Sequence, residues 1–248
     1  MHTLYLGPSW AVQSFESLSG INDPVKTNLA KELRIPKCTL LARYAHSNFD
    51  QLECARHFME NNSYLDPFRL VFVTANALQD GDLYYNMSQI DFAKMFLRSQ
   101  DPLDLIFSLE EKFYQQINQI DIPVALIGAH TDVKIQNQHN NITVIHPSWQ
   151  NFLGSCCGLN SFYGWAADVA HRWLQGIVIP RVGNEIRFDL GANPSATVVN
   201  EIHKIVFDVW GKLEQNQLFK GVHPNILGNQ LFAKEIADPL NQWIDNVV

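Results

Sequence analysis

Short apolar runs alternate with longer amphipathic stretches along the chain, and no other feature constrains the fold as strongly. An unbroken apolar run of roughly four to eight residues fits a strand that is buried on both faces. Apolar residues three or four positions apart fit a helix that covers such a strand. Strands that alternate with helices pair in parallel, because each helix carries the chain back across the sheet. The expected strands are 3–7, 38–44, 69–75, 124–129 and 142–147.

The expected architecture is a three-layer α/β/α fold with a five-stranded, mainly parallel sheet. Ser47 or Asn48 suits the N-cap of a helix expected at 48–61, and Pro102 suits the first turn of one expected at 102–119. Gly20 and Pro24 are expected to break or bend the first helix. The helical spacing covers 12–33, 48–61, 88–98 and 102–119.

The whole chain, 1–248, is expected to form one domain, since it has no internal repeat and no linker rich in Pro, Gly or Ser. From about 155 to 219 the alternation changes. A candidate hairpin turns at Gly183–Asn184, and a helix is expected from 195 to about 213. We expect residues 155–219 to be an insertion that serves as a cap or a dimer surface, and a dimer surface would make the protein a homo-oligomer.

The charge balance excludes some partners. The chain has a net charge of −7 and lacks the Lys and Arg clusters that recruit polyphosphates, so we expect no nucleic-acid partner. The first residues have no basic segment followed by a long apolar one, and no apolar run approaches the length of a membrane span. We therefore expect a cytoplasmic protein with no membrane partner.

Polar residues follow the expected strands where an open parallel sheet binds its ligands, beyond the carboxyl ends of the strands. Ser9 follows the first strand, His46 and Ser47 follow the second, and Asn76 follows the third. His223 lies near the end of the chain, where we expect it to start the final helix. A nucleophilic serine needs a base for its proton and hydrogen-bond donors for the oxyanion. Ser9, His223 and Asn76 supply these three groups, and backbone N–H groups near Ser9 and Ser47 would add donors.

Three sequence blocks resemble the GDSL-type esterases and lipases, also called SGNH hydrolases. In that family a serine follows the first strand, an asparagine follows the third, and a histidine block opens the last helix. Here “GPS” (7–9), “TAN” (74–76) and “GVHPNILG” (221–228) resemble those blocks. The resemblance covers residues 3–154 and about 218–248. It implies an SGNH-hydrolase-like, flavodoxin-like fold.

The blocks also depart from the family pattern. Pro8 replaces the acid before the serine, Ser47 stands near the position of the second-block glycine, and Ala77 follows Asn76 where the family has Asp. Lys220 occupies the position of the acid that orients the histidine, and loss of such an acid costs orders of magnitude in rate. The orienting hydrogen bond could come instead from a backbone carbonyl or from a carboxylate elsewhere: Asp80, Asp82, Asp132 or Asp189.

The resemblance implies a carboxylic ester hydrolase or acyltransferase that needs no cofactor. Ser9 would attack the ester, His223 would act as the base, and Asn76 would hold the oxyanion. Trp10 and His46 are expected to contribute to binding, and a small-molecule or glycan ester, such as an O-acetylated sugar, is the expected substrate. The alternative is a catalytically inactive relative that binds a carbohydrate, a nucleotide or a protein, and the altered acid positions favour it.

Other candidate sites have weaker signals. His130 and Asp132 follow the fourth strand, and His146 follows the fifth. A metal site would need a third ligand at suitable spacing, and none is evident, so no metal is expected. Cys156 and Cys157 have small neighbours that favour packing over catalysis. All four cysteines are expected to be reduced.

Overall fold

The structure is a computed structural model of the 248-residue chain. The helices expected at 12–33, 88–98 and 195–213 lie outside the residues that it describes. Those residues are 1–8, 11, 38–43, 47–75, 102–129, 133, 135, 140–158, 181–182, 185–186, 215–220 and 223–247. Only the backbone is described for 102–109, 181–182, 185–186, 219–220 and 223.

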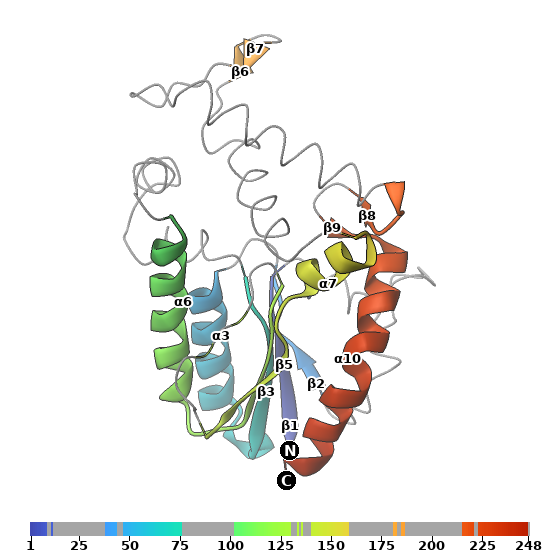
Figure 1. The fold of residues 1–248 in the computed structure, drawn as a ribbon. Helices are drawn as coiled ribbons and strands as arrows, with labels where there is room; N and C mark the ends of the chain where they lie inside the picture. Colours follow the sequence, from blue (N-terminus) through green and yellow to red (C-terminus); the bar gives the residue numbers. More distant parts are fainter. Residues whose placement is uncertain are drawn as a thin grey trace.

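A five-stranded sheet forms the centre of the fold, and every pairing in it is parallel (Figure 1). The strand order is β2-β1-β3-β4-β5, one of the two common orders of doubly wound α/β domains. All five strands fall within a few residues of their expected positions, so this part of the sequence prediction is confirmed. The strands are β1 (His2–Leu6), β2 (Cys38–Leu40), β3 (Phe68–Val73), β4 (Val124–Ile127) and β5 (Ile142–His146).

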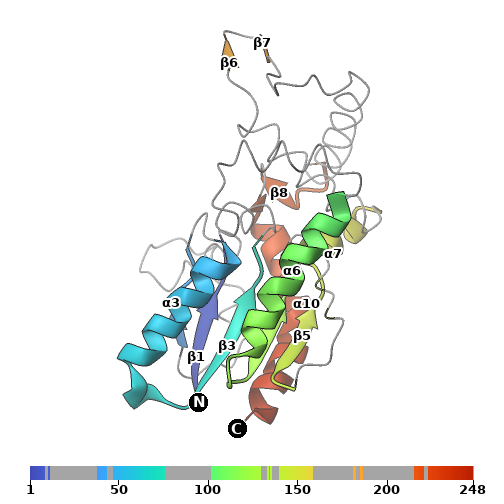
Figure 2. The same cartoon turned by 90° about the vertical axis from the view of Figure 1, so that its left-hand side faces the viewer.

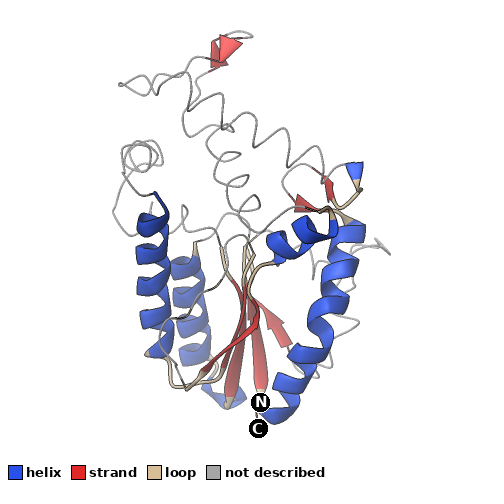
Figure 3. Cartoon of the chain, viewed as in Figure 1, coloured by secondary structure: helices blue, strands red, loops and turns tan. Residues whose placement is uncertain are grey.

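Helices cover both faces of the sheet, which gives the expected three layers (Figures 1, 2 and 3). The helices α3 and α6 lie on one face, and α7 and α10 lie on the other. The described helices are α3 (Asn48–Asn61), the 3-10 helix η2 (Ser63–Leu65), α6 (Pro102–Asn118), α7 (Trp149–Cys156) and α10 (Ile226–Asn246).

Alternate residues of β1 enter the two apolar layers, as a strand buried on both faces requires. Leu4 and Leu6 belong to a buried cluster with Phe113 of α6. Tyr5 belongs to the other cluster, with Phe232 of α10. Burial of each large apolar side chain contributes roughly 1.5–3 kcal/mol, so both helical layers stabilise the position of β1.

The helix starts follow local sequence signals. Ser47 is the N-cap of α3, which confirms one of the two expected capping residues, and Pro102 is the first residue of α6, as expected. Asn48 is instead the first residue of α3. An antiparallel pair, β6 (Arg181–Val182) and β7 (Glu185–Ile186), flanks the predicted turn at Gly183–Asn184.

The prediction that His223 starts the final helix is wrong. His223 and Pro224 form the short strand β9 (His223–Pro224), which pairs antiparallel with β8 (Phe219–Lys220). The helix α10 begins at Ile226, because Asn225 is its N-cap and accepts a hydrogen bond from Gly228 N–H at 3.0 Å. An asparagine satisfies these free N–H groups, whereas a proline ring carries no acceptor, so the cap lies one residue after Pro224.

A buried arginine closes the amino end of the sheet. Arg69 Nε donates to Thr3 Oγ1 at 2.8 Å, and its Nη1 donates to the Ile244 carbonyl at 2.6 Å. The second bond ties the last turn of α10 to β3. Burial lowers the pKa of the Arg69 guanidinium, and the nearby carboxylate of Asp245 partly offsets this effect. On β2, the edge strand on the far side of β1, burial raises the pKa of the Cys38 thiol to about 11, so this cysteine is protonated at neutral pH.

Among the described helices, none combines the length and the apolar character that crossing a membrane requires.

Candidate functional site

The strand order places the topological switch point of the sheet between β1 and β3. The chain moves from β1 to β2 on one side, and β3, β4 and β5 then follow on the other side of β1. Ligands of doubly wound domains bind at this point, beyond the carboxyl ends of the strands. Ser9 is three residues after Leu6, where β1 ends, and Asn76 is three residues after Val73, where β3 ends. Both residues lie outside the described part of the chain, but the segments that lead to them are described.

The turn after β1 begins at a residue that must be glycine. Gly7 has φ +156°, and a Cβ built on it would lie 2.3 Å from Ala11 Cβ and 2.8 Å from Val73 Cβ. No real Cβ makes such contacts, so the turn can pack this closely against β3 only without a side chain. The Ala11 N–H then donates to the Pro8 carbonyl at 2.9 Å. The positions of Ser9 and Trp10 lie between these two fixed residues, and Ser9 and Trp10 themselves are not described.

The end of β3 is held by the side chain of Asn48. Asn48 Oδ1 accepts from the Ala75 N–H at 2.6 Å, and its Nδ2 donates to the Ala75 carbonyl at 3.4 Å. Asn48 is 2% exposed and Ala75 is 3% exposed, so both bonds are shielded from water. One side chain therefore satisfies both backbone groups of the residue directly before Asn76. Sequence reasoning missed this role and considered Asn48 only as a cap.

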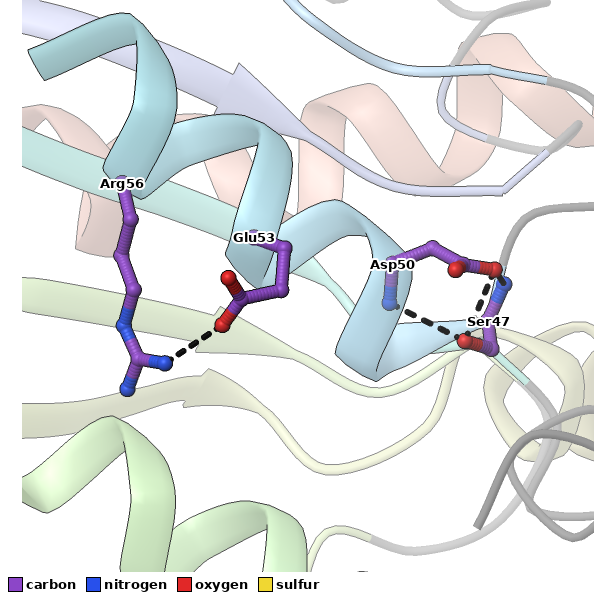
Figure 4. Close-up of polar contacts among 4 residues, drawn as sticks. All are labelled: Ser47, Asp50, Glu53 and Arg56. Atoms are coloured by element: carbon purple, nitrogen blue, oxygen red, sulfur yellow. Dashed lines mark hydrogen bonds and ion pairs between the residues drawn. The ribbon is translucent and has the colours of Figure 1, made fainter. Parts of the chain in front are cut away.

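Ser47 has a structural role at the start of α3 (Figure 4). Its Oγ accepts from the Asp50 N–H at 3.1 Å, and its own N–H donates to Asp50 Oδ2 at 3.2 Å, which is a capping box. The predicted use of a backbone N–H near Ser47 for the oxyanion would require this amide to be shared with Asp50. The neighbouring His46 lies outside the described residues. The Arg56–Glu53 ion pair one turn later, at 2.5 Å, is solvent-exposed and contributes little.

Hydrogen bonds continue along the same edge of the sheet toward β4 and β5. The Thr74 N–H donates to the Ile127 carbonyl at 2.9 Å, and Thr74 Oγ1 accepts from the Ala129 N–H at 3.4 Å. The Trp149 N–H at the start of α7 donates to the Gly128 carbonyl at 2.6 Å. The loops after β3 and β4 and the start of α7 are therefore connected through their backbones.

The segment that carries His223 is anchored to the start of α10. The Asn225 N–H donates to the Leu218 carbonyl at 2.9 Å, and a Cβ on Gly228 would lie 2.4 Å from that carbonyl oxygen. Leu218 and Ala11 belong to the same buried apolar cluster. The strand β8 lies beyond the carboxyl ends of the sheet strands in both views (Figures 1 and 2), and its partner β9 lies beside it (Figure 1). The backbone of His223 is thus at the same end of the sheet as the turn after β1. The side chain of His223 is not described.

Lys220 is the direct cross-strand partner of His223 in the β8–β9 pair. From the sequence alone, Lys220 is identified only as a replacement for the family acid three residues before the histidine. The register shows why that position matters, since opposed residues of an antiparallel pair are near neighbours. A lysine at this position cannot accept a hydrogen bond from an imidazole N–H, because an ammonium has donors only.

Asn229, in the first turns of α10, is a further polar residue beside this segment. Its Nδ2 donates to the Pro224 carbonyl at 3.4 Å. Its Oδ1 is buried and has no hydrogen-bond partner among the described residues. A buried amide oxygen without a partner costs about 1–3 kcal/mol, so an acceptor held here calls for an explanation. No local sequence signal indicates it, because an asparagine at this helix position is usually solvated.

The other predicted residues do not form a second site among the described residues. His146 packs edge-on against Phe152 and Phe232, and its Nδ1 accepts from the Ser148 N–H at 3.2 Å, so it is a packing residue. No three His, Cys, Asp or Glu side chains gather as metal ligands within the described ranges. His130 and the alternative orienting carboxylates are outside those ranges: Asp80, Asp82, Asp132 and Asp189.

The cysteines in the described residues are free thiols. Cys156 is exposed, and Cys157 is half-buried at the end of α7. Burial raises the pKa of the Cys157 thiol, and the adjacent Cys156 raises it further. A raised pKa disfavours the thiolate, so Cys157 is poorly suited to act as a nucleophile.

No family model, curated protein or solved structure matches this chain. The resemblance of the three blocks to SGNH hydrolases therefore stays a prediction.

Proposed function

We propose that this protein is a serine esterase of the SGNH type, which hydrolyses or transfers an acyl group through an acyl-serine at Ser9. One observation carries the proposal. The turn that leads to Ser9 and the loop that leads to Asn76 leave neighbouring strands at the switch point, and Gly7 packs directly against Val73. A serine and an amide donor that follow closely packed neighbouring strands suit a nucleophile beside its oxyanion site.

The proposed reaction has two halves. His223 accepts the proton of Ser9 Oγ while this oxygen attacks the ester carbonyl, and Asn76 with backbone N–H groups stabilises the oxyanion. The C–O bond to the alcohol then breaks, and the imidazolium returns its proton to the leaving alcohol. Water or an acceptor alcohol releases the acyl group by the reverse of these steps. A small O-acyl group on a sugar is the proposed substrate.

The base needs a group that fixes its tautomer, and Lys220 cannot supply one. We assign this role to Asn229 Oδ1, which is buried without a partner among the described residues and belongs to an amide that contacts Pro224, the neighbour of His223. A neutral amide can orient an imidazole, but it stabilises the imidazolium less than a carboxylate does. The proposed enzyme is therefore slower than one with a complete triad.

Covalent labelling tests the nucleophile directly. A fluorophosphonate probe should modify the wild-type protein at Ser9, located by peptide mass spectrometry, and p-nitrophenyl acetate should be hydrolysed. The Ser9→Ala variant should lose the label and about 10³-fold or more of the hydrolysis rate. Ser63→Ala is the matched control, because Ser63 is exposed in η2 at the opposite end of the sheet. Labelling at another serine would overturn the assignment.

The alternative function is a binding module that has lost catalysis. The replacement of family acids at Pro8, Ala77 and Lys220 favours this reading. It predicts a folded protein that is neither labelled by the fluorophosphonate nor active on acetylated sugars, and that binds a carbohydrate, nucleotide or protein. Labelling of Ser9 together with hydrolysis excludes it.

A further inference from the structure

We infer that Asn48 is a positioning residue for the oxyanion site, and that it acts by fixing the peptide that leads into Asn76. This inference rests on the proposed function. Asn48 does not belong to any of the blocks that resemble the SGNH family. It is selected by its geometry alone, because its side chain binds both backbone groups of Ala75.

The two hydrogen bonds constrain a specific peptide plane. The Ala75 carbonyl, which accepts from Asn48 Nδ2 at 3.4 Å, belongs to the peptide bond between Ala75 and Asn76. A peptide unit is planar, so a fixed carbonyl oxygen also fixes the direction in which the next residue begins. The shorter bond, 2.6 Å from the Ala75 N–H to Asn48 Oδ1, holds the preceding peptide in the same way. Asn48 thus limits rotation on both sides of Ala75.

Asn48 is itself held on a rigid element. It is the first residue of α3, directly after the capping box of Ser47 and Asp50. Farther along, Leu52 and Ala55 of this helix are fully buried against the sheet. A short side chain at a capped and packed helix start has little freedom, so the position of α3 is transmitted to the end of β3.

This arrangement is more than a stabilising contact because oxyanion donors must be placed accurately. Effective donors lie about 2.7–3.1 Å from the position of the oxyanion, and an error of about 1 Å can cost about 100-fold in rate. On the side toward β4, the Thr74 N–H donates to the Ile127 carbonyl, and Thr74 Oγ1 accepts from the Ala129 N–H. Removal of the Asn48 side chain would free Ala75 only on the side that faces α3. It should therefore lower kcat much more than it changes KM.

The experiment compares Asn48→Ala with Asn141→Ala. Asn141 also joins two backbone groups through its side chain, with Nδ2 donating to the carbonyls of Ile120 at 2.7 Å and Ile122 at 3.3 Å, but it lies at the amino end of β5. Both variants should lose thermal stability to a similar extent. We expect Asn48→Ala to slow fluorophosphonate labelling of Ser9 and to lower kcat by about 10- to 100-fold, with KM within about 2-fold. Asn141→Ala should keep the wild-type labelling rate and kcat.

A second variant covers the case in which Asn48→Ala does not fold. Asn48→Asp is isosteric and keeps the acceptor for the Ala75 N–H, but it removes the donor to the Ala75 carbonyl. Fluorophosphonate should also label Ser9 slowly in this variant, because the peptide bond between Ala75 and Asn76 is then no longer held by Asn48. A folded Asn48 variant that labels at the wild-type rate, or equal losses in Asn48→Ala and Asn141→Ala, would overturn the inference. Absence of labelling at Ser9 in the wild type would instead refute the esterase proposal.

Discussion

Buried polar groups do different work at the two ends of the parallel sheet. At the amino end, Arg69 donates to Thr3 and to the Ile244 carbonyl, and these bonds attach the end of α10 to the strands. At the carboxyl end, Asn48 binds the N–H and the carbonyl of Ala75, two residues after β3 ends. The bonds of Arg69 join a helix to the sheet, whereas the bonds of Asn48 hold the backbone that follows a strand.

The two ends also differ in how fully the polar groups are used. Arg69 has hydrogen-bond partners on β1 and α10. At the carboxyl end, Asn229 Oδ1 is buried without a partner among the described residues, and Gly7 packs so closely that a side chain cannot be added. Unsatisfied groups and tight backbone contacts reduce stability, and proteins retain them where function requires them. We therefore expect changes at the amino end to affect stability alone, and changes at the carboxyl end to affect activity.

The largest effect is expected from Gly7→Ala. The added Cβ would lie 2.3 Å from Ala11 Cβ and 2.8 Å from Val73 Cβ, at φ +156°. Overpacking together with an unfavourable backbone conformation should cost about 2–4 kcal/mol, measured by urea denaturation. Hydrolysis by the remaining folded protein should fall as well, because the turn that carries Ser9 must move away from β3. Gly158→Ala is the control for backbone conformation, since Gly158 has φ +73° but no atom within 4 Å of an added Cβ. Full activity in folded Gly7→Ala protein would contradict a functional role for the turn after β1.

A smaller effect, on stability alone, is expected from Arg69→Met. Methionine fills similar space, but it leaves the Ile244 carbonyl and Thr3 Oγ1 without the donors they have now. The cost should be about 1–3 kcal/mol in the free energy of unfolding. The kcat and KM of the folded variant should match the wild type, because the change lies at the end of the sheet opposite the proposed site. A drop in kcat without a loss of stability would contradict the separation of the two ends.

The sequence predicted the parts of the fold that depend on local periodicity. The strands, α3 and the start of α6 follow from apolar spacing, and the cap at Ser47 follows from residue chemistry at the helix start. The start of α10 was misplaced by the proline after His223. A proline suits both a first helical turn and a short edge strand, and only the pairing of β8 with β9 decides between them.

Long-range contacts account for what the sequence did not predict. Asn48 and Ala75 are separated by 27 positions, and no spacing rule joins them. The same holds for Arg69 and Ile244, which are separated by 175 positions. The three blocks at Ser9, Asn76 and His223 identified candidate chemistry, whereas the groups that hold those blocks in place became visible only when the strands were assembled.

The smallest effect, and the sharpest test of the orienting group, is expected from Asn229→Ala. If Asn229 Oδ1 accepts from the His223 imidazole, its loss should lower kcat by about 10-fold and leave KM nearly unchanged. The melting temperature should fall only slightly, because the variant also loses the long bond, 3.4 Å, from Asn229 Nδ2 to the Pro224 carbonyl. Asn62→Ala is the matched control, because Asn62 Nδ2 also donates to a backbone carbonyl, that of Phe58 at 2.8 Å, at the far end of α3.

The aspartate variant at the same position gives a readout that packing alone would not move. In Asn229→Asp a carboxylate would stabilise the imidazolium and raise the pKa of the base relative to the wild type. The neutral imidazole would then form only at higher pH, so the acidic limb of the kcat profile should move to higher pH while the maximal rate recovers or exceeds that of the wild type. Identical pH profiles for the wild type and the aspartate variant would show that position 229 does not contact the base. The orienting acceptor would then have to be a carbonyl or a carboxylate from another loop at this edge.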